Sequence, residues 1–320
     1  MVQKTRRRVL IAGVLASAGL MNSKIANAIP NGKLTIALVV KSLADPFTMA
    51  MSSGAQNYQK HFASEFDLTV RSTASATDTA GQIRIVDELI ASHVNAIVLA
   101  PTDSKALVPV VARAIDAGII VIAIDNPLDE SATRAAHIEV PFVGPDNFKG
   151  ARIVADYLAT RLKPGDEVGI IEGVASDRNA QQRTAGFEEA MNAAHLKIAA
   201  TASGDWDYSK GKAAAAVMMA QHPRLRGLLC ANDSIATGAV DAVRNAHRTG
   251  NVYVTGYNND ASITPLLATG RILATVDQFP ARQAVFGVDM ALKALNELTR
   301  QQDLSPYIET PLQLVTGNAR

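Results

Sequence analysis

The chain has 320 residues, of which 48% are hydrophobic and 19% charged, an ordinary composition for a globular protein with room for two domains. Its formal net charge is +1, but the first 28 residues hold five basic side chains and no acidic one. The remainder has 26 basic against 30 acidic residues, a net charge of −4, which argues against a nucleic-acid-binding surface. The single cysteine, Cys230, excludes an intramolecular disulfide and a cysteine metal cluster.

The first 28 residues have the three parts of an export signal. Residues 5–8 are positively charged, residues 9–21 are apolar, and Ala26-Asn27-Ala28 has the small residues of a cleavage site. The apolar run is shorter than the roughly 20 residues that a membrane anchor needs. We therefore predict a signal peptide over 1–28, and a protein exported to the periplasm that begins near Ile29. Residues 5–10 are also similar to a twin-arginine signal, although basic leader segments contain Arg pairs by chance.

From residue 34 onward, runs typical of buried strands alternate with helical patterns. The expected strands are 34–40, 68–71, 96–99, 119–124, 167–171, 198–201, 227–230, 252–257 and 272–276. The expected helices are 49–61, 79–91, 104–117, 147–161, 183–194, 210–221, 235–246 and 282–299. Gly118 suits the end of the third helix. A polar interval over 128–142, with a short apolar run at 137–140, lies between the two halves, and a tail passes through Pro306 and Pro311.

This alternation predicts an α/β fold with parallel sheets and crossover helices on both faces. The comparable blocks 34–124 and 167–257 favour two similar domains over one sheet of nine or ten strands. No linker rich in Gly, Ser or Pro separates the blocks. We therefore expect short ordered connections and a hinge about a shared cleft.

Polar and aromatic residues follow the expected strands at the end where parallel sheets bind ligands. They include Asp45, Phe47, Asp125, Asn126, Asn232, Asn258 and Gln278, with Arg183 and the only tryptophan, Trp206, a little further along the chain. Taken singly, each is explained by helix capping, core packing or a solvated charge. Taken together, acids, amides, a guanidinium and aromatic faces suit a small polyhydroxylated ligand held between two domains.

Sequence motifs for other chemistry are missing. There is no Walker A loop, G-x-G-x-x-G, H-E-x-x-H or G-x-S-x-G, and the six histidines lack metal-ligand spacing. We predict no catalytic residue, no metal and no cofactor. An enzyme that uses Asp45 and Asp125 as an acid/base pair is the alternative, but the groups around them resemble recognition groups. The turn at residues 100–104 is interpreted as structural.

The chain resembles the type 1 periplasmic binding proteins, and within them the ribose-binding branch, over residues 33–315. The landmarks are the apolar strand at 36–40 with Pro46-Phe47, the turn at 100–104, the strand ending in Asp125, and the segments 183–187, 231–233, 256–258 and 277–280. The resemblance implies two Rossmann-like domains joined by a three-segment hinge. The lobes would comprise residues 31–143 plus 280–310 and residues 144–279 plus 311–320, in a monomer.

The same resemblance assigns the ligand contacts. Those of the first lobe are Asp45, Phe47, Thr48, Asp125 and Asn126, and those of the second lobe and hinge are Arg183, Trp206, Asn232, Asn258 and Gln278. The ribose branch has Asn in place of Asp45, Arg in place of Asn126, Asp in place of Asn258, Phe in place of Thr48 and Phe in place of Trp206. Because buried polar groups left unpaired cost about 1–3 kcal/mol each, we expect the site to reject ribose and to take another small sugar, deoxy sugar or polyol.

The implied function is capture of this ligand by hinge closure and delivery to an ABC permease in the inner membrane. The alternative is a periplasmic sensor that presents its closed form to a chemoreceptor or histidine kinase. A sugar-responsive repressor, whose ligand domain shares this fold, would need a helix-turn-helix before Lys33, where this chain has the export signal instead.

Overall fold

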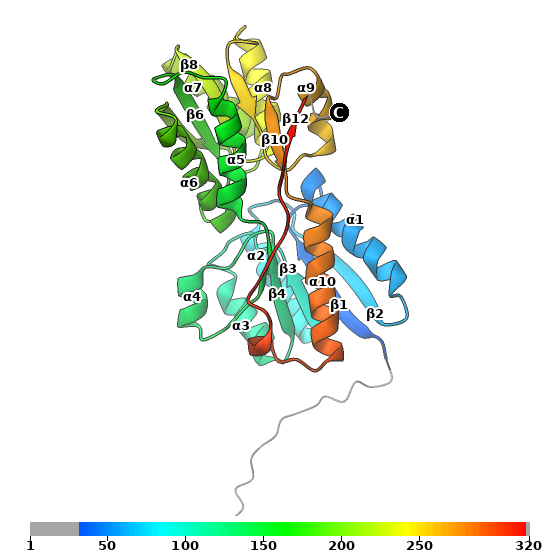
Figure 1. Ribbon diagram of the computed structural model, residues 1–320. Helices are drawn as coiled ribbons and strands as arrows, with labels where there is room; N and C mark the ends of the chain where they lie inside the picture. Colours follow the sequence, from blue (N-terminus) through cyan, green and yellow to red (C-terminus); the bar gives the residue numbers. More distant parts are fainter. Residues whose placement is uncertain (1–31, 318–320) are drawn as a thin grey trace, which may run out of the picture. The chain divides into compact units, whose positions relative to one another are not determined.

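The structure, a computed structural model, describes residues 32–317, which contain two six-stranded sheets (Figure 1). The first sheet has the order β11-β5-β4-β3-β1-β2, and all its strand pairs are parallel. Its strands are β1 (Leu34–Val40), β2 (Phe66–Ser72), β3 (Ala96–Leu99), β4 (Ile120–Ile124), β5 (Phe142–Gly144) and β11 (Tyr307–Glu309). The predicted α/β fold with two parallel-sheet domains is confirmed.

The second sheet has the order β12-β10-β9-β8-β6-β7, and only β12 runs antiparallel to its neighbour. Its strands are β6 (Glu167–Glu172), β7 (Lys197–Ser203), β8 (Leu225–Cys230), β9 (Tyr253–Thr255), β10 (Ala274–Asp277) and β12 (Gln313–Thr316). We call the first sheet with its helices the first lobe, and the second sheet with its helices the second lobe. The chain crosses between them after β5, after β10 and between β11 and β12.

Helices cover both faces of each sheet. In the first lobe these are α1 (Pro46–His61) and α10 (Pro280–Asn296) on one face, and α2 (Thr79–Ala91) and α3 (Val108–Asp116) on the other, with α4 (Glu130–Ala135) beyond. In the second lobe these are α5 (Asn147–Ala159) and α6 (Arg178–Ala193) on one face, and α7 (Tyr208–Gln221), α8 (Asp233–Asn245) and α9 (Thr264–Ala268) on the other. From Lys33 on, the described residues form one compact unit.

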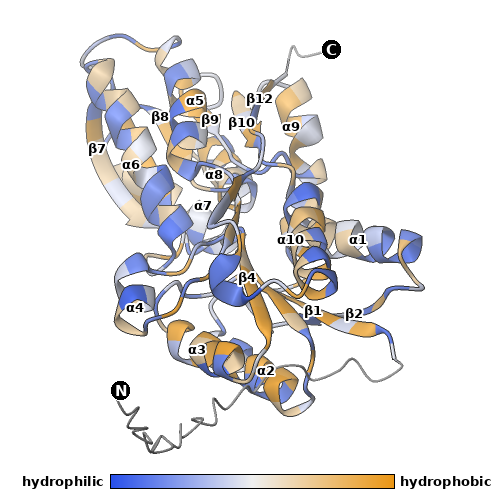
Figure 2. Ribbon diagram, turned by 60° about the horizontal axis from the view of Figure 1, so that its bottom comes forward, coloured by the Kyte–Doolittle hydropathy of each residue, from blue (hydrophilic) through white to orange (hydrophobic). Residues whose placement is uncertain are grey.

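The side chains of β1 show why this strand lies between two helical layers. Ile36 and Leu38 pack into the core under α1 and α10, whereas Ala37 and Val39 pack against α2 and α3. A strand buried on both faces needs apolar residues at every position, since successive side chains point to opposite faces. Figure 2 shows β1 and β4 as mainly hydrophobic ribbons.

The structure differs from the predicted elements mainly in the short ones. Helix α3 begins at Val108 and not at 104, because the Asp103 carboxylate accepts bonds from the N–H groups of Lys105 and Ala106 and forms a turn there. The polar interval 128–142, for which no helix or strand was predicted, holds α4, and β5 begins at its last residue. The tail contributes β11 and β12, which the hydrophobic pattern did not predict. Gly118 follows α3 in the left-handed conformation, as expected.

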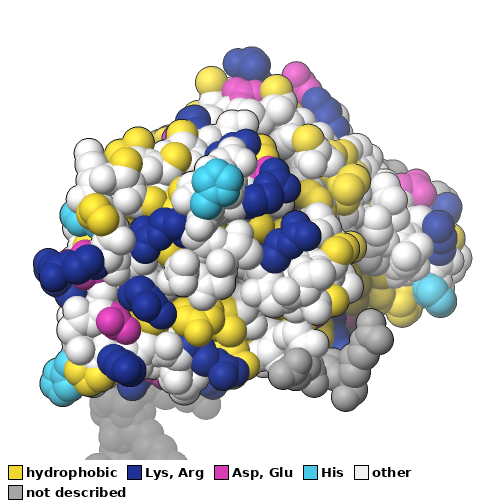
Figure 3. All heavy atoms as spheres, turned by 90° about the horizontal axis from the view of Figure 1, so that it is seen from above, with side chains coloured by type: hydrophobic (Ala, Val, Ile, Leu, Met, Phe, Trp, Pro, Cys, Tyr) yellow, Lys and Arg dark blue, Asp and Glu magenta, His cyan; other side chains and the backbone are white. Residues whose placement is uncertain are grey.

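Among the described residues, no helix has the length and apolar character that a bilayer crossing requires. Figure 3 shows one face, on which hydrophobic side chains are interspersed with polar and basic ones. The predicted signal peptide, its cleavage site and the twin-arginine run lie outside the described residues.

Candidate functional site

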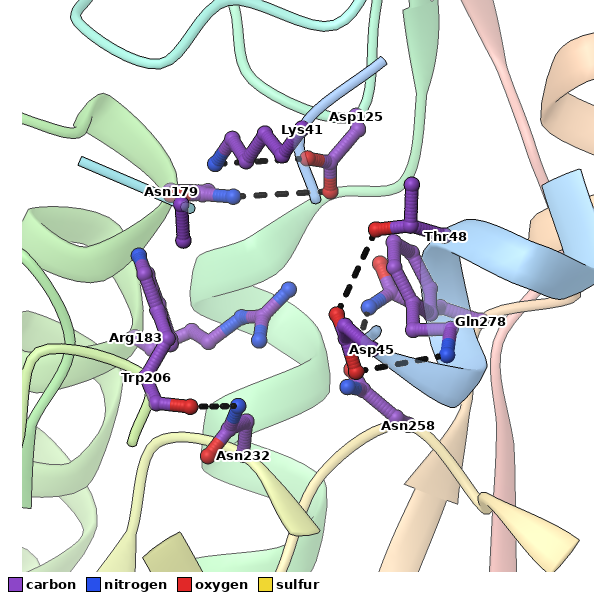
Figure 4. A pocket seen from close by; sticks show the side chains of 12 residues that line it. Lys41, Asp45, Thr48, Asp125, Asn179, Arg183, Trp206, Asn232, Asn258 and Gln278 are labelled. Carbon is purple, nitrogen blue, oxygen red and sulfur yellow. Dashed lines mark hydrogen bonds and ion pairs between the residues drawn. The ribbon is translucent and has the colours of Figure 1, made fainter. Parts of the chain in front are cut away.

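A pocket of about 360 Å³, partly open to solvent, lies where side chains of the two lobes meet (Figure 4). Its lining residues are Lys41, Asp45, Phe47, Thr48, Ala76, Asp125, Asn179, Arg183, Trp206, Asn232, Asn258 and Gln278. The structure therefore brings together nine of the ten predicted site residues, the exception being Asn126.

The first turn of α1 supplies three of these side chains. Asp45 is the N-cap of the helix, and its carboxylate accepts from the Phe47 N–H and the Thr48 hydroxyl, each at 3.4 Å. Burial raises the pKa of Asp45, against the bond from the Phe47 N–H. Phe47 packs into the core of the first lobe and also lines the pocket, so the cap and the aromatic wall are fixed together.

Arg183 enters the pocket from α6 and is held on three sides. Its Nε donates to Asn147 Oδ1 at 2.9 Å, and its Nη1 donates to the Ala231 carbonyl at 2.8 Å. Its guanidinium carbon lies 3.8 Å from the ring centroid of Tyr257. Figure 4 shows the guanidinium pointing into the pocket. The fork of donors is thus preoriented on a side chain that is itself buried.

Trp206 forms a wall of the pocket in a left-handed backbone conformation, with φ 62°. Its Nε1–H donates to Asp177 Oδ2 at 2.8 Å, and its carbonyl accepts from Asn232 Nδ2 at 3.3 Å. Gly173 lets the ring approach closely, because a Cβ there would lie 2.1 Å from Trp206 ring carbons. The ring is therefore held in place by contacts at both its edge and its face.

The remaining predicted residues line the second-lobe side and the hinge. Asn232 is the N-cap of α8 and accepts from the Ile235 N–H at 2.8 Å. Gln278 Nε2 donates to Asn258 Oδ1 at 2.7 Å. Asn258 has φ 130°, and Asp125 on the opposite lobe has φ 63°. Left-handed conformations cost non-glycine residues roughly 1–2 kcal/mol, so backbone strain gathers around this pocket.

Asn126 is fully buried beside the pocket and does not line it. Its Nδ2 donates to the Pro101 carbonyl at 3.1 Å, and its Oδ1 accepts from the Ser104 hydroxyl and the Asn179 N–H, each at 3.2 Å. Both ends of the amide are engaged within the protein. Asn126 was predicted as a ligand contact, but in the structure it does not line the pocket.

The structure adds three lining residues that the prediction missed: Lys41, Ala76 and Asn179. Lys41 Nζ lies 3.0 Å from Asp177 Oδ2 and 3.6 Å from Asp125 Oδ2. Burial alone would lower the pKa of Lys41, but the two carboxylates outweigh it and hold that pKa above its ordinary value. The signal available in the sequence was a lysine directly after the apolar run at 36–40.

Asn179 could also have been found, since it precedes Arg183 by four residues and so shares its helix face. Its Nδ2 lies 3.5 Å from Asp125 Oδ1, and its own Oδ1 is buried without a partner in the described protein. Ala76 had no signal in the sequence. No cluster of three metal-ligating side chains occurs among the described residues.

The arrangement suits recognition of hydroxyl groups. Carboxylates of Asp45 and Asp125 accept hydrogen bonds, Arg183 and the amides donate them, and Trp206 and Phe47 offer apolar faces.

Comparisons with known proteins identify the family of the chain. The model of the periplasmic binding protein domain matches residues 36–299. The D-ribose/D-allose-binding protein of Pseudomonas aeruginosa is 53% identical over 312 residues, which cover 97% of this chain and 98% of that protein.

Two crystal structures of ABC transporter solute-binding proteins are similar in fold. The one from Burkholderia multivorans, with an unknown ligand represented as α-D-erythrofuranose, is 56% identical with a TM-score of 0.87 and covers 89% of this chain and 100% of its own. The one from Actinobacillus succinogenes 130z, with bound D-allose, is 31% identical with a TM-score of 0.82 and covers 89% and 98%.

Proposed function

Because the chain belongs to the periplasmic binding protein family, we propose that its pocket binds D-allose and D-ribose as pyranoses when the two lobes close on them. The family and the close relatives establish the coarser function: a periplasmic sugar-binding protein of an ABC transporter, and not an enzyme. The proposal adds the ligands, the closure and the delivery of the bound sugar to a permease.

The observation that carries the proposal is that polar groups of both lobes and two aromatic faces line one pocket. Pyranose forms of D-ribose and D-allose have the same configuration at their three secondary ring carbons, and allose adds a hydroxymethyl group. Asp125 and Arg183 both line the pocket and would serve as an acceptor and a donor for such vicinal hydroxyls. Trp206 would cover the C–H face of the ring.

The proposal revises the expectation that the altered contacts reject ribose. A relative with 53% identity over nearly the whole chain carries both ribose and allose in its name. Lys41 and Asn179, which the sequence analysis missed, add polar groups to a pocket that is changed at Asp45 and Asn258. The donor and acceptor inventory of the pocket is therefore larger than the predicted residues alone suggest.

In this proposal the two lobes move relative to each other as rigid units. We take residues 31–143 plus 280–310 and residues 144–279 plus 311–320 as the rigid units, in a monomer exported by the signal at 1–28. Contacts from both units to one sugar would stabilise the closed arrangement, which the permease then reads. No observation on the described residues favours the sensor alternative.

A thermal-shift panel with the mature chain, residues 29–320, tests the proposal. D-allose or D-ribose at 100 times its dissociation constant should add about 2.7 kcal/mol to the free energy of unfolding and raise the melting temperature by a few degrees. D-glucose and D-arabinose, which differ in hydroxyl configuration, serve as controls and should shift it less. An unchanged melting temperature with both D-allose and D-ribose would contradict the proposal.

A further inference from the structure

Helix α6 begins at the cleft without the cap that its own sequence offers. Asp177 occupies the N-cap position, yet its side chain makes no capping bond. Six other Asp or Asn residues at N-caps of described α-helices do make that bond: Asp45, Asp78, Asp129, Asp146, Asp207 and Asn232. The Asp177 carboxylate therefore interacts with groups other than the N–H groups of its own helix.

The partner of Asp177 lies on the other lobe. Its Oδ2 lies 3.0 Å from the Nζ of Lys41, which follows β1 in the first lobe. The side chain of Asp177 is fully buried and that of Lys41 is 10% exposed. The same Oδ2 accepts the bond from Trp206 Nε1–H, so the ion pair and the aromatic wall share one oxygen. Separating the lobes would break this pair and return both charges to water.

The first lobe also supplies the acceptors that α6 lacks. The Arg178 N–H donates to the Ser104 hydroxyl at 2.9 Å, and the Asn179 N–H donates to Asn126 Oδ1 at 3.2 Å. Both acceptors belong to the first lobe, and neither lines the pocket. These two N–H groups are among those that a helix leaves without intrahelical partners. Helix α6 is thus capped by the opposite lobe.

We propose that the start of α6 is a latch across the cleft. With the lobes apart, Asp177 turns back and caps its own helix, as the other N-cap aspartates do. With the lobes together, Asp177 pairs with Lys41, and Ser104 and Asn126 take over the capping. The latch rests on the proposed closure around a sugar. It makes Ser104, Asn126 and Asp177 positioning residues that set how long the cleft stays closed.

Release kinetics test the latch, with fluorescence of the single Trp206 as the signal. Capping side chains replaced by Ala cost about 0.5–2 kcal/mol, so S104A and N126A should each release D-allose roughly two- to thirty-fold faster. Their association rates should match wild type, because the latch forms after the sugar has entered. S52A is the matched control: Ser52 is also a buried serine of the first lobe but does not line the pocket, and its release rate should not change.

Unchanged release from both S104A and N126A would overturn the latch, as would an equal change in S52A. If no sugar binds even to wild type, the proposed function fails. The latch is then tested by disulfide cross-linking between two introduced cysteines. The S104C/R178C protein should then cross-link under mild oxidation, whereas S104C/E188C, with its second cysteine farther along α6, should not. Absence of the S104C/R178C cross-link, with and without sugar, would overturn the latch independently of the ligand.

Discussion

Two of the side chains that line this pocket are also helix caps. Asp45 caps α1 and Asn232 caps α8, and both line the pocket. A helix that follows a parallel strand begins at the sheet edge where ligands bind, so its cap residue lies there as well. A capping role for Asp45 and Asn232 is therefore compatible with the prediction that they contact the ligand.

Thr48 provides a test of sugar choice at a single residue. It is 3% exposed and lines the pocket where the ribose branch has Phe. We propose that the hydroxymethyl group of allose lies beside Thr48, and in T48F the larger side chain would occupy that space. Overpacking costs about 1–3 kcal/mol, so calorimetry should show D-allose affinity falling roughly five- to a hundred-fold, with D-ribose affected less. An equal loss for both sugars would contradict this role of Thr48.

Asp260 makes stability depend on pH. Its backbone N–H donates to Asp233 Oδ2 at 2.8 Å, and its own Oδ2 is buried without a partner in the described protein. Burial, followed by the charge of Asp233, raises the pKa of Asp260 to about 8. Between pH of about 4 and 8 the unfolded chain releases a proton that the folded chain keeps, so this group lowers the free energy of unfolding as pH rises.

The substitution D260N should remove this decrease in the free energy of unfolding at higher pH. The melting temperature of D260N minus that of wild type should become larger as pH rises from 5 to 8. D67N is the control, since Asp67 lies on the exposed surface, and it should show the same pH dependence as wild type. A D260N protein with the same pH dependence as wild type would show that Asp260 is ionised in the folded state.

At the scale of elements, the long buried segments could be predicted and the short edge strands could not. Strands β1 and β3 match the predicted ranges because their apolar runs are continuous and end at polar turns. Strand β11 has three residues with exposed side chains at both ends, and it exists through its pairing with β5. Such a strand depends on tertiary contacts that hydrophobic periodicity does not report.

Helix pairing in the second lobe depends on a glycine. A Cβ on Gly238 of α8 would lie 2.2 Å from the Tyr208 carbonyl of α7, a backbone atom. G238A should push the helices apart, cost about 1–3 kcal/mol and lower the melting temperature by several degrees. G227A is the control, since the nearest atoms to its Cβ are side-chain carbons at 3.1 Å or more, which can move. Equal melting temperatures for the two variants would contradict this account.

At the scale of the whole molecule, the two lobes could be predicted from the repeated strand–helix blocks, but their contacts could not. Lys41 and Asp177 are 136 positions apart, and nothing in either local pattern pairs them. The orientation of Asn126 could not be predicted for the same reason. The resemblance indicated that Asn126 lies at the sheet edge, whereas its hydrogen bonds with Ser104 and Asn179 determine the direction of its side chain.

The central claim, that both lobes bind one sugar in this pocket, is tested most directly by calorimetric titration of the mature protein and of D125A with D-allose. Asp125 is the better choice than Arg183, whose bonds to Asn147 and Ala231 also support the second lobe. We expect one site per chain in wild type and loss of measurable binding in D125A, with a melting temperature that still shows a folded protein. Equal affinity in the two proteins would place the sugar elsewhere and contradict the account.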